Sequence, residues 1–146
     1  MGLTDACCFW TLTWTSTWTW TNLRDVNFRK LEVYQIAVRF LPLAAAIADS
    51  LPPRYASLGD QIRRASVSIP LNIAEGSGKS TGPDQRRFYS IARGSAMECG
   101  AILDACTALG LIGQPQAEEA YQLLLSTVRM LSKMCRPQEP KIQVKV

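Results

Sequence analysis

The chain has 146 residues, of which 47% are apolar, and a formal net charge of +4. This length favours one domain with a hydrophobic core, and so mild a positive charge does not by itself indicate nucleic-acid binding. The chain has no histidine, and none of its five cysteines belongs to a Cys-x-x-Cys pair. These features argue against a zinc site and against an imidazole base. We therefore expect no metal, no cofactor and no catalytic residue, and the free thiols favour the reducing cytoplasm.

Residues 1–27 differ in composition from the rest. In FWTLTWTSTWTWTN, threonine alternates with tryptophan or leucine, and all four tryptophans of the chain lie here. The segment lacks the charged and aliphatic regions of a secretory signal, and it is too short and too rich in threonine to cross a bilayer. An interfacial anchor or an added strand stays open as an alternative. We expect a low-complexity Thr/Trp leader outside the fold, translated from a misplaced start codon, and no membrane association.

Apolar residues recur every three or four positions from Phe28 onward, which predicts helices. The first helix is expected to end at Pro52-Pro53 and to be kinked at Pro42. Its predicted core face consists of Phe28, Leu31, Tyr34, Val38, Leu41, Ala45 and Ala48. The second is expected to bend at Pro70 and to end at Gly76 and Gly78. Its predicted core face consists of Leu58, Ile62, Ala65, Ile69 and Ile73.

Two more helices are expected after residue 80. Ser80 to Asp84 provide a cap, a proline and an acid for the start of the third, and Gly110 ends it. Its predicted stripe is Phe88, Ile91, Ser95, Cys99, Ile102, Cys106 and Leu109. The fourth runs from Pro115 to Arg136-Pro137, with Tyr121, Leu124, Leu125, Val128, Leu131 and Cys135 on its apolar face. The sequence thus predicts an all-α fold, an antiparallel up-down four-helix bundle over residues 28–136, followed by a flexible tail at 137–146.

The stretch AEGSGKST, residues 74–81, resembles the end of a phosphate-binding P-loop. The P-loop template requires a glycine at position 73, where this chain has Ile73, and a buried strand before the loop. The preceding residues have helical periodicity instead. We therefore interpret the stretch as a helix end, a glycine-rich turn and the cap of the next helix.

The segments SIPLNIAEG, residues 68–76, and RRFYSIARGSAMEC, residues 86–99, resemble one protein family. It comprises small bacterial four-helix-bundle proteins, many of them encoded in intervening sequences of 23S ribosomal RNA genes. The matching positions are Ser68, Ile69, Pro70, Asn72, Ile73, Ala74, Glu75, Gly76, Phe88, Ala92, Gly94, Ser95 and Glu98. The resemblance extends over residues 28–136 and implies a four-helix bundle assembled as a cyclic homopentamer. The chain also resembles the accessory protein of diversity-generating retroelements, which binds a reverse transcriptase and nucleic acid.

Polar residues within these motifs could form either a ligand site or a structural network. Asn72 and Glu75 are three residues apart, between apolar positions of the same helix. We favour the structural interpretation, in which Glu75 meets an arginine in a buried network, Asn72 holds a carbonyl freed by Pro70, and Glu98 bonds across a close helix contact. The structural motif then consists of Ser68, Pro70, Asn72, Glu75, Gly76, Ser95 and Glu98.

Charges separate towards the two ends of an antiparallel bundle. The end that holds the 76–82 turn collects Arg29, Lys30, Lys79, Arg86, Arg87, Arg129, Lys133 and Arg136, with Arg93 two turns further along. Only Glu32, Glu75 and Asp84 oppose them there. The other end collects Asp49, Asp60, Asp104, Glu118 and Glu119, with Arg54 alone against them. In a ring the basic ends would form one positive face, which favours RNA or other nucleic acid as a ligand. A scaffold that binds a protein partner stays open as the alternative.

Overall fold

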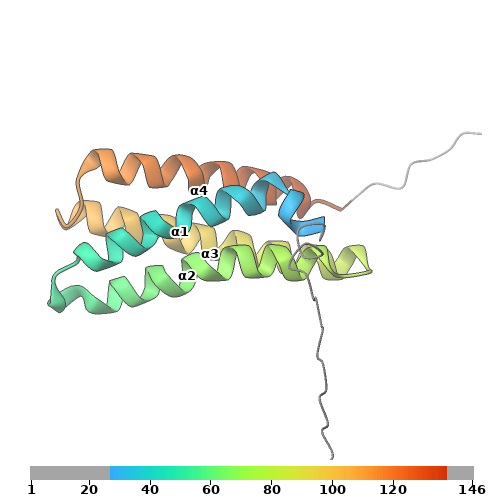
Figure 1. Cartoon of the computed structure of the whole chain (residues 1–146), viewed down its shortest axis with the longest axis horizontal. Coiled ribbons are helices and arrows are strands. Elements are labelled where there is room, and N and C mark those ends of the chain that lie inside the picture. Colours follow the sequence, from blue (N-terminus) through green and yellow to red (C-terminus); the bar gives the residue numbers. More distant parts are fainter. Residues whose placement is uncertain (1–26, 138–146) are drawn as a thin grey trace, which may run out of the picture.

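Four long helices make up the part of the chain that the computed structural model describes, residues 27–137. They are α1 (Glu32–Ser50), α2 (Ala56–Ser77), α3 (Gly82–Ala108) and α4 (Gln114–Met134). Two short 3-10 helices, η2 (Asn27–Lys30) and η3 (Pro53–Tyr55), precede α1 and α2. The long helices lie side by side along one common direction, and short connections join them at alternate ends of the bundle (Figure 1). The all-α prediction is confirmed, whereas the predictions for the leader and the tail concern residues outside those described.

Local chemistry determines where α2 ends and α3 begins. The Gly78 amide donates to the carbonyls of Ala74 and Glu75 and so closes α2. Thr81 then caps α3, because its hydroxyl oxygen accepts from the Asp84 amide at 3.3 Å. The interpretation of AEGSGKST as a helix end, a turn and a cap is confirmed. Gly110 follows α3 with φ of 66°, a conformation that favours glycine.

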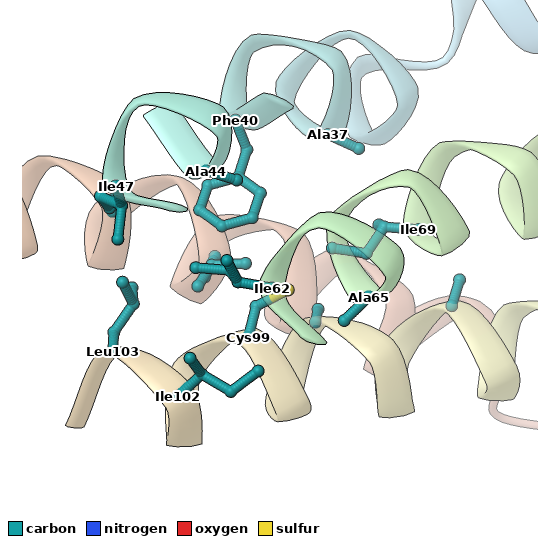
Figure 2. Packing of buried hydrophobic residues seen from close by; sticks show 14 of the residues in the cluster. Ala37, Phe40, Ala44, Ile47, Ile62, Ala65, Ile69, Cys99, Ile102 and Leu103 are labelled. Carbon is teal, nitrogen blue, oxygen red and sulfur yellow. The ribbon is translucent and has the colours of Figure 1, made fainter. Parts of the chain in front are cut away.

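Each helix packs against two others, since α1 contacts α2 and α4, and α3 contacts α2 and α4. Phe40, Ile47, Ile62 and Ile69 meet between them and are fully buried (Figure 2). Cys99 is also in the core, as predicted. Burial, with a smaller contribution from the Glu98 carboxylate, raises the pKa of the Cys99 thiol to about 12. The thiol is therefore protonated at neutral pH and serves as a small core residue.

The face that α1 turns towards the core differs from the predicted one. Val33, Ala37, Phe40, Ala44 and Ile47 are buried, whereas Val38 of the predicted stripe is 39% exposed. The physical reason is that two apolar stripes, one residue apart, run along α1, so periodicity alone does not decide which of them is buried. Only contact with α2 and α4 selects the buried face.

The predicted faces of α3 and α4 were also partly wrong. In α3, Cys99, Ile102 and Cys106 are buried as predicted. Three predicted core residues are instead exposed: Ile91 of α3, Leu109 at the C-cap of α3, and Leu125 of α4. The first half of α3 instead buries Tyr89, Ala92 and Ala96. Two of these are alanines, which carry little weight in a periodicity argument although they allow helices to approach closely.

Among the described helices, α1 alone has a length and composition that would suffice to cross a membrane. A core helix of a bundle meets the same two criteria. Phe40 and Ile47 of α1 are fully buried against the other helices. One face of α1 is therefore part of the bundle core.

Candidate nucleic-acid interface

Seven of the eight predicted nucleic-acid-binding residues lie on segments that meet at one end of the bundle. The 3-10 helix η2, the turn between α2 and α3, and the end of α4 share that end (Figure 1). These segments carry Arg29, Lys30, Lys79, Arg86, Arg87, Lys133 and Arg136. Arg93 is different, because it lies about 16 Å along α3 from Gly82 at the usual helical rise. We call the seven residues the basic end.

Lys79 and Arg29 of the basic end contact neighbouring side chains. The Lys79 ammonium pairs with the Glu75 carboxylate and lies 4.9 Å from the centre of the Phe88 ring. The Arg29 guanidinium lies 5.9 Å from the centre of the Phe28 ring. The charge of Lys79 is therefore largely offset by Glu75 and adds little to the positive potential of the basic end.

Four other members form no ion pair within residues 27–137: Arg86, Arg87, Lys133 and Arg136. Arg86 is half-buried and the remaining three are exposed. Of the nearby acids, Asp84 accepts a hydrogen bond from the Thr81 hydroxyl at 2.5 Å, and Glu75 is occupied by Lys79. The third acid, Glu32, is exposed and lines a hollow with Lys133 but forms no ion pair within residues 27–137. The basic end thus presents positive charge that the described residues do not neutralise.

The opposite end is less acidic than the sequence predicted. Arg63 forms an ion pair with Asp49 and a second one with Asp60, where Nη1 and Oδ1 are 3.5 Å apart. The prediction that Arg54 alone opposes these acids was therefore wrong. It failed because Arg63 lies two turns into α2 and was not assigned to this end of the bundle. Its long side chain nevertheless reaches Asp49 of α1 and Asp60 of α2.

Asp104, a third acid of this end, accepts a hydrogen bond from the Tyr121 hydroxyl across α3 and α4. The same hydroxyl lies 3.2 Å from the Gly100 carbonyl oxygen. Burial, together with the hydrogen bond to Asp104 and the charge of that carboxylate, raises the pKa of Tyr121 to about 12. Asp104 is therefore committed to helix packing.

Three motif residues form a hydrogen-bond network between α2 and α3. The Asn72 amide donates to the Ser68 carbonyl at 2.8 Å and to the Ser68 hydroxyl at 3.0 Å. The Ser95 hydroxyl lies 2.9 Å from that of Ser68. The structural interpretation fits these residues, although Asn72 holds the Ser68 carbonyl and not one freed by Pro70. α2 continues through Pro70, which is buried.

The two motif glutamates do not have the predicted buried partners. The Glu75 side chain is 52% exposed and pairs with Lys79 of the following turn, so the prediction of a buried pair with an arginine was wrong. Glu98 is exposed and forms no hydrogen bond or ion pair within the described residues. Both positions lie beyond the edge of the α2–α3 contact, where the chain faces solvent.

Gly76, and not Gly94, allows α2 and α3 to approach closely. A Cβ atom on Gly76 would lie 2.7 Å from Cε1 of Tyr89, so only glycine allows this approach of α2 and α3. A Cβ on Gly94 would meet nothing within 4 Å. Gly76 is therefore needed for the contact next to the turn, whereas Gly94 faces solvent.

Sequence reasoning missed two surface features. A groove of about 460 Å³ follows α2 and is lined by Arg63, Arg64, Val67, Ser68, Leu71 and Asn72. A cavity of about 270 Å³ in the basic end is lined by Gly82, Gln85, Arg86, Met134 and Arg136. The sequence contained a sign of the groove, since Val67 and Leu71 are apolar residues outside the predicted core face of this helix. The sequence contained no sign of the cavity, because the cavity depends on how α3 packs against α4.

A family model described as 23S rRNA-intervening sequence protein matches residues 29–133. The match begins within η2 and ends in the last turn of α4, so it covers most of the chain and nearly all of the bundle. No curated protein matches the chain.

Proposed function

The chain belongs to the family of 23S rRNA-intervening sequence proteins, and we propose that it is a non-enzymatic, cytoplasmic RNA-binding protein. In this proposal, antiparallel up-down bundles assemble into a cyclic homo-oligomer, most simply a pentamer. The observation that carries the proposal is the charge of Arg86, Arg87, Lys133 and Arg136 at one end of the bundle, since these residues form no ion pair within residues 27–137. Such a surface attracts phosphates, and a cyclic ring repeats it on one face.

Apolar side chains on the outer surface of α2 and α3 support self-association. Leu71 is 63% exposed, Met97 60%, Val67 47% and Ile91 43%. Large apolar side chains gathered on a surface are typical of an interaction site. Light scattering should report a closed oligomer, and Leu71→Asp should dissociate it, while Leu109→Asp, at an exposed position after α3, should not. A monomer across the micromolar range would contradict assembly.

RNA binding can be tested by reversing charges at the basic end. Arg87→Glu combined with Lys133→Glu should lower the affinity for single-stranded RNA and flatten its salt dependence by a log–log slope of about 0.7 for each phosphate that the variant no longer neutralises. Both side chains are exposed, so the melting temperature should change little. Fluorescence anisotropy across a salt series measures both effects.

The matched control is Arg39→Glu combined with Arg54→Glu. It changes the net charge by the same amount, in the middle of α1 and at the opposite end of the bundle. If this control weakens RNA binding as much, only net charge matters and the basic end is not the interface. If the wild type binds no RNA even at low salt, the proposal fails.

The groove of about 460 Å³ on α2 favours the alternative function, a scaffold for a protein partner. Val67 and Leu71 provide apolar contact there, and Arg64 provides a charge at its edge. Binding through such a groove would tolerate salt, in contrast to RNA binding. Pulldown from native lysate with and without nuclease separates the two functions, since only a protein partner survives nuclease at high salt.

A further inference from the structure

The cavity in the basic end lies between the start of α3 and the end of α4. Its volume is about 270 Å³, and two arginines, Arg86 from α3 and Arg136 just after α4, contribute to its wall. Neither forms an ion pair within residues 27–137. Gln85 and Met134 complete the sides. Two guanidinium groups from separate elements thus line one small cavity without a described carboxylate partner.

Local contacts hold this arrangement in place. The Cys135 sulfur lies 4.0 Å from the Arg86 carbonyl oxygen, so the end of α4 packs on the backbone of α3. The side-chain amide of Gln85 donates to the Lys79 carbonyl at 2.8 Å, which fixes the Gln85 side chain beside Arg86. An added Cβ on Gly82 would lie 3.1 Å from Nη1 of Arg86, so the guanidinium folds back over the first turn of its own helix.

Two helix ends of opposite partial charge border the cavity, the start of α3 and the end of α4. The first turn of a helix carries a partial positive charge, so a cation there gains nothing from the helix dipole. Asp84 is the acid of this turn, but it is exposed, is bonded to the Thr81 hydroxyl and does not line the cavity. An anionic group inside the cavity would stabilise both arginines.

We propose that this cavity binds a terminal phosphate group, a phosphomonoester such as the one at the 5′ end of an RNA strand. The inference rests on the RNA binding proposed above. A phosphomonoester carries a charge of about −1.5 to −2 at pH 7, which matches two guanidinium groups, and each guanidinium donates paired hydrogen bonds to its oxygens. The cavity, of about 270 Å³, has room for a phosphate group between the two arginines. A small phosphorylated metabolite offers the same chemistry, and the test distinguishes the two sources.

The experiment compares two single-stranded RNAs of one sequence, with a 5′ phosphate or a 5′ hydroxyl and a fluorophore at the 3′ end. The wild type should bind the phosphorylated strand about tenfold more tightly, since hydrogen bonds to charged groups each contribute that much or more. Arg86→Gln with Arg136→Gln should abolish the preference. Arg39→Gln with Arg54→Gln, the matched control, should keep it.

Equal affinity of the wild type for the two strands would overturn the inference and leave the proposed function intact. If neither strand binds, the proposed function fails, and glycerol 3-phosphate then becomes the probe. A shift of the Arg86 side-chain NMR resonance on its addition, lost in Arg136→Gln, would keep the cavity as a site for small phosphorylated molecules; no shift would overturn it. Arg136 is exposed beyond the end of α4, so this single variant should fold even if the double variant does not.

Discussion

Replacing Gly76 with alanine should destabilise the bundle, because the added methyl group enters the contact between α2 and α3. Its Cβ would lie 2.7 Å from Cε1 and 3.0 Å from Cδ1 of Tyr89, and 3.1 Å from Cβ of Phe88. The Tyr89 ring is only 7% exposed and has little room to move. The perturbation therefore measures how tightly the turn between α2 and α3 is packed.

Two effects of opposite sign determine the magnitude. Alanine gains at most about 1 kcal/mol over glycine in a helix, and less in the last turn, where Gly76 lies. Overpacking a buried contact costs about 1–3 kcal/mol. We therefore expect Gly76→Ala to lower the free energy of unfolding by about 1–2 kcal/mol.

Urea unfolding followed by circular dichroism, at one fixed protomer concentration, measures this change. Gly94→Ala is the matched control, because its Cβ would meet nothing within 4 Å in the middle of α3. It should be neutral or stabilise by up to about 1 kcal/mol. If Gly76→Ala is as stable as Gly94→Ala, the argument from the Tyr89 contact is refuted.

Three further outcomes are expected. Glu75→Ala should cost less than about 0.5 kcal/mol in urea unfolding, because its pair with Lys79 is exposed and spans i to i+4; a cost above about 1 kcal/mol would restore a buried role. Tyr121→Phe should reduce the loss of stability between about pH 10 and 12, since the folded protein keeps the Tyr121 proton there and the unfolded chain releases it; identical pH profiles of thermal unfolding would contradict the raised pKa. A chain shortened to begin at Phe28 should keep the melting temperature of the full chain, and a much lower value would give residues 1–27 a role in the fold.

Features that depend on local chemistry could be predicted from the sequence. Thr81, Gly78 and Gly110 define helix ends because capping and turn conformation involve only neighbouring residues. Periodicity was sufficient for the number of helices. The family followed from the motif at residues 68–76 together with the segment at 86–99, and the family model agrees. The same reasoning correctly excluded a phosphate-binding loop at Lys79.

Features that depend on distant segments required the tertiary structure. Two apolar stripes one residue apart run along α1, so its neighbours decided that Val33 is buried and Val38 is exposed. Glu75 and Asn72 are three residues apart, yet only Asn72 lies within the α2–α3 contact.

The candidate interface shows the same division. The sequence by itself determined that basic residues gather at one end, because helix lengths and alternating chain direction are properties of the sequence pattern. Only the packing of α3 against the end of α4 decided that Arg86 and Arg136 line one cavity, while Lys79 is occupied by Glu75. A side chain's charge is encoded locally, but its partner depends on which helices meet.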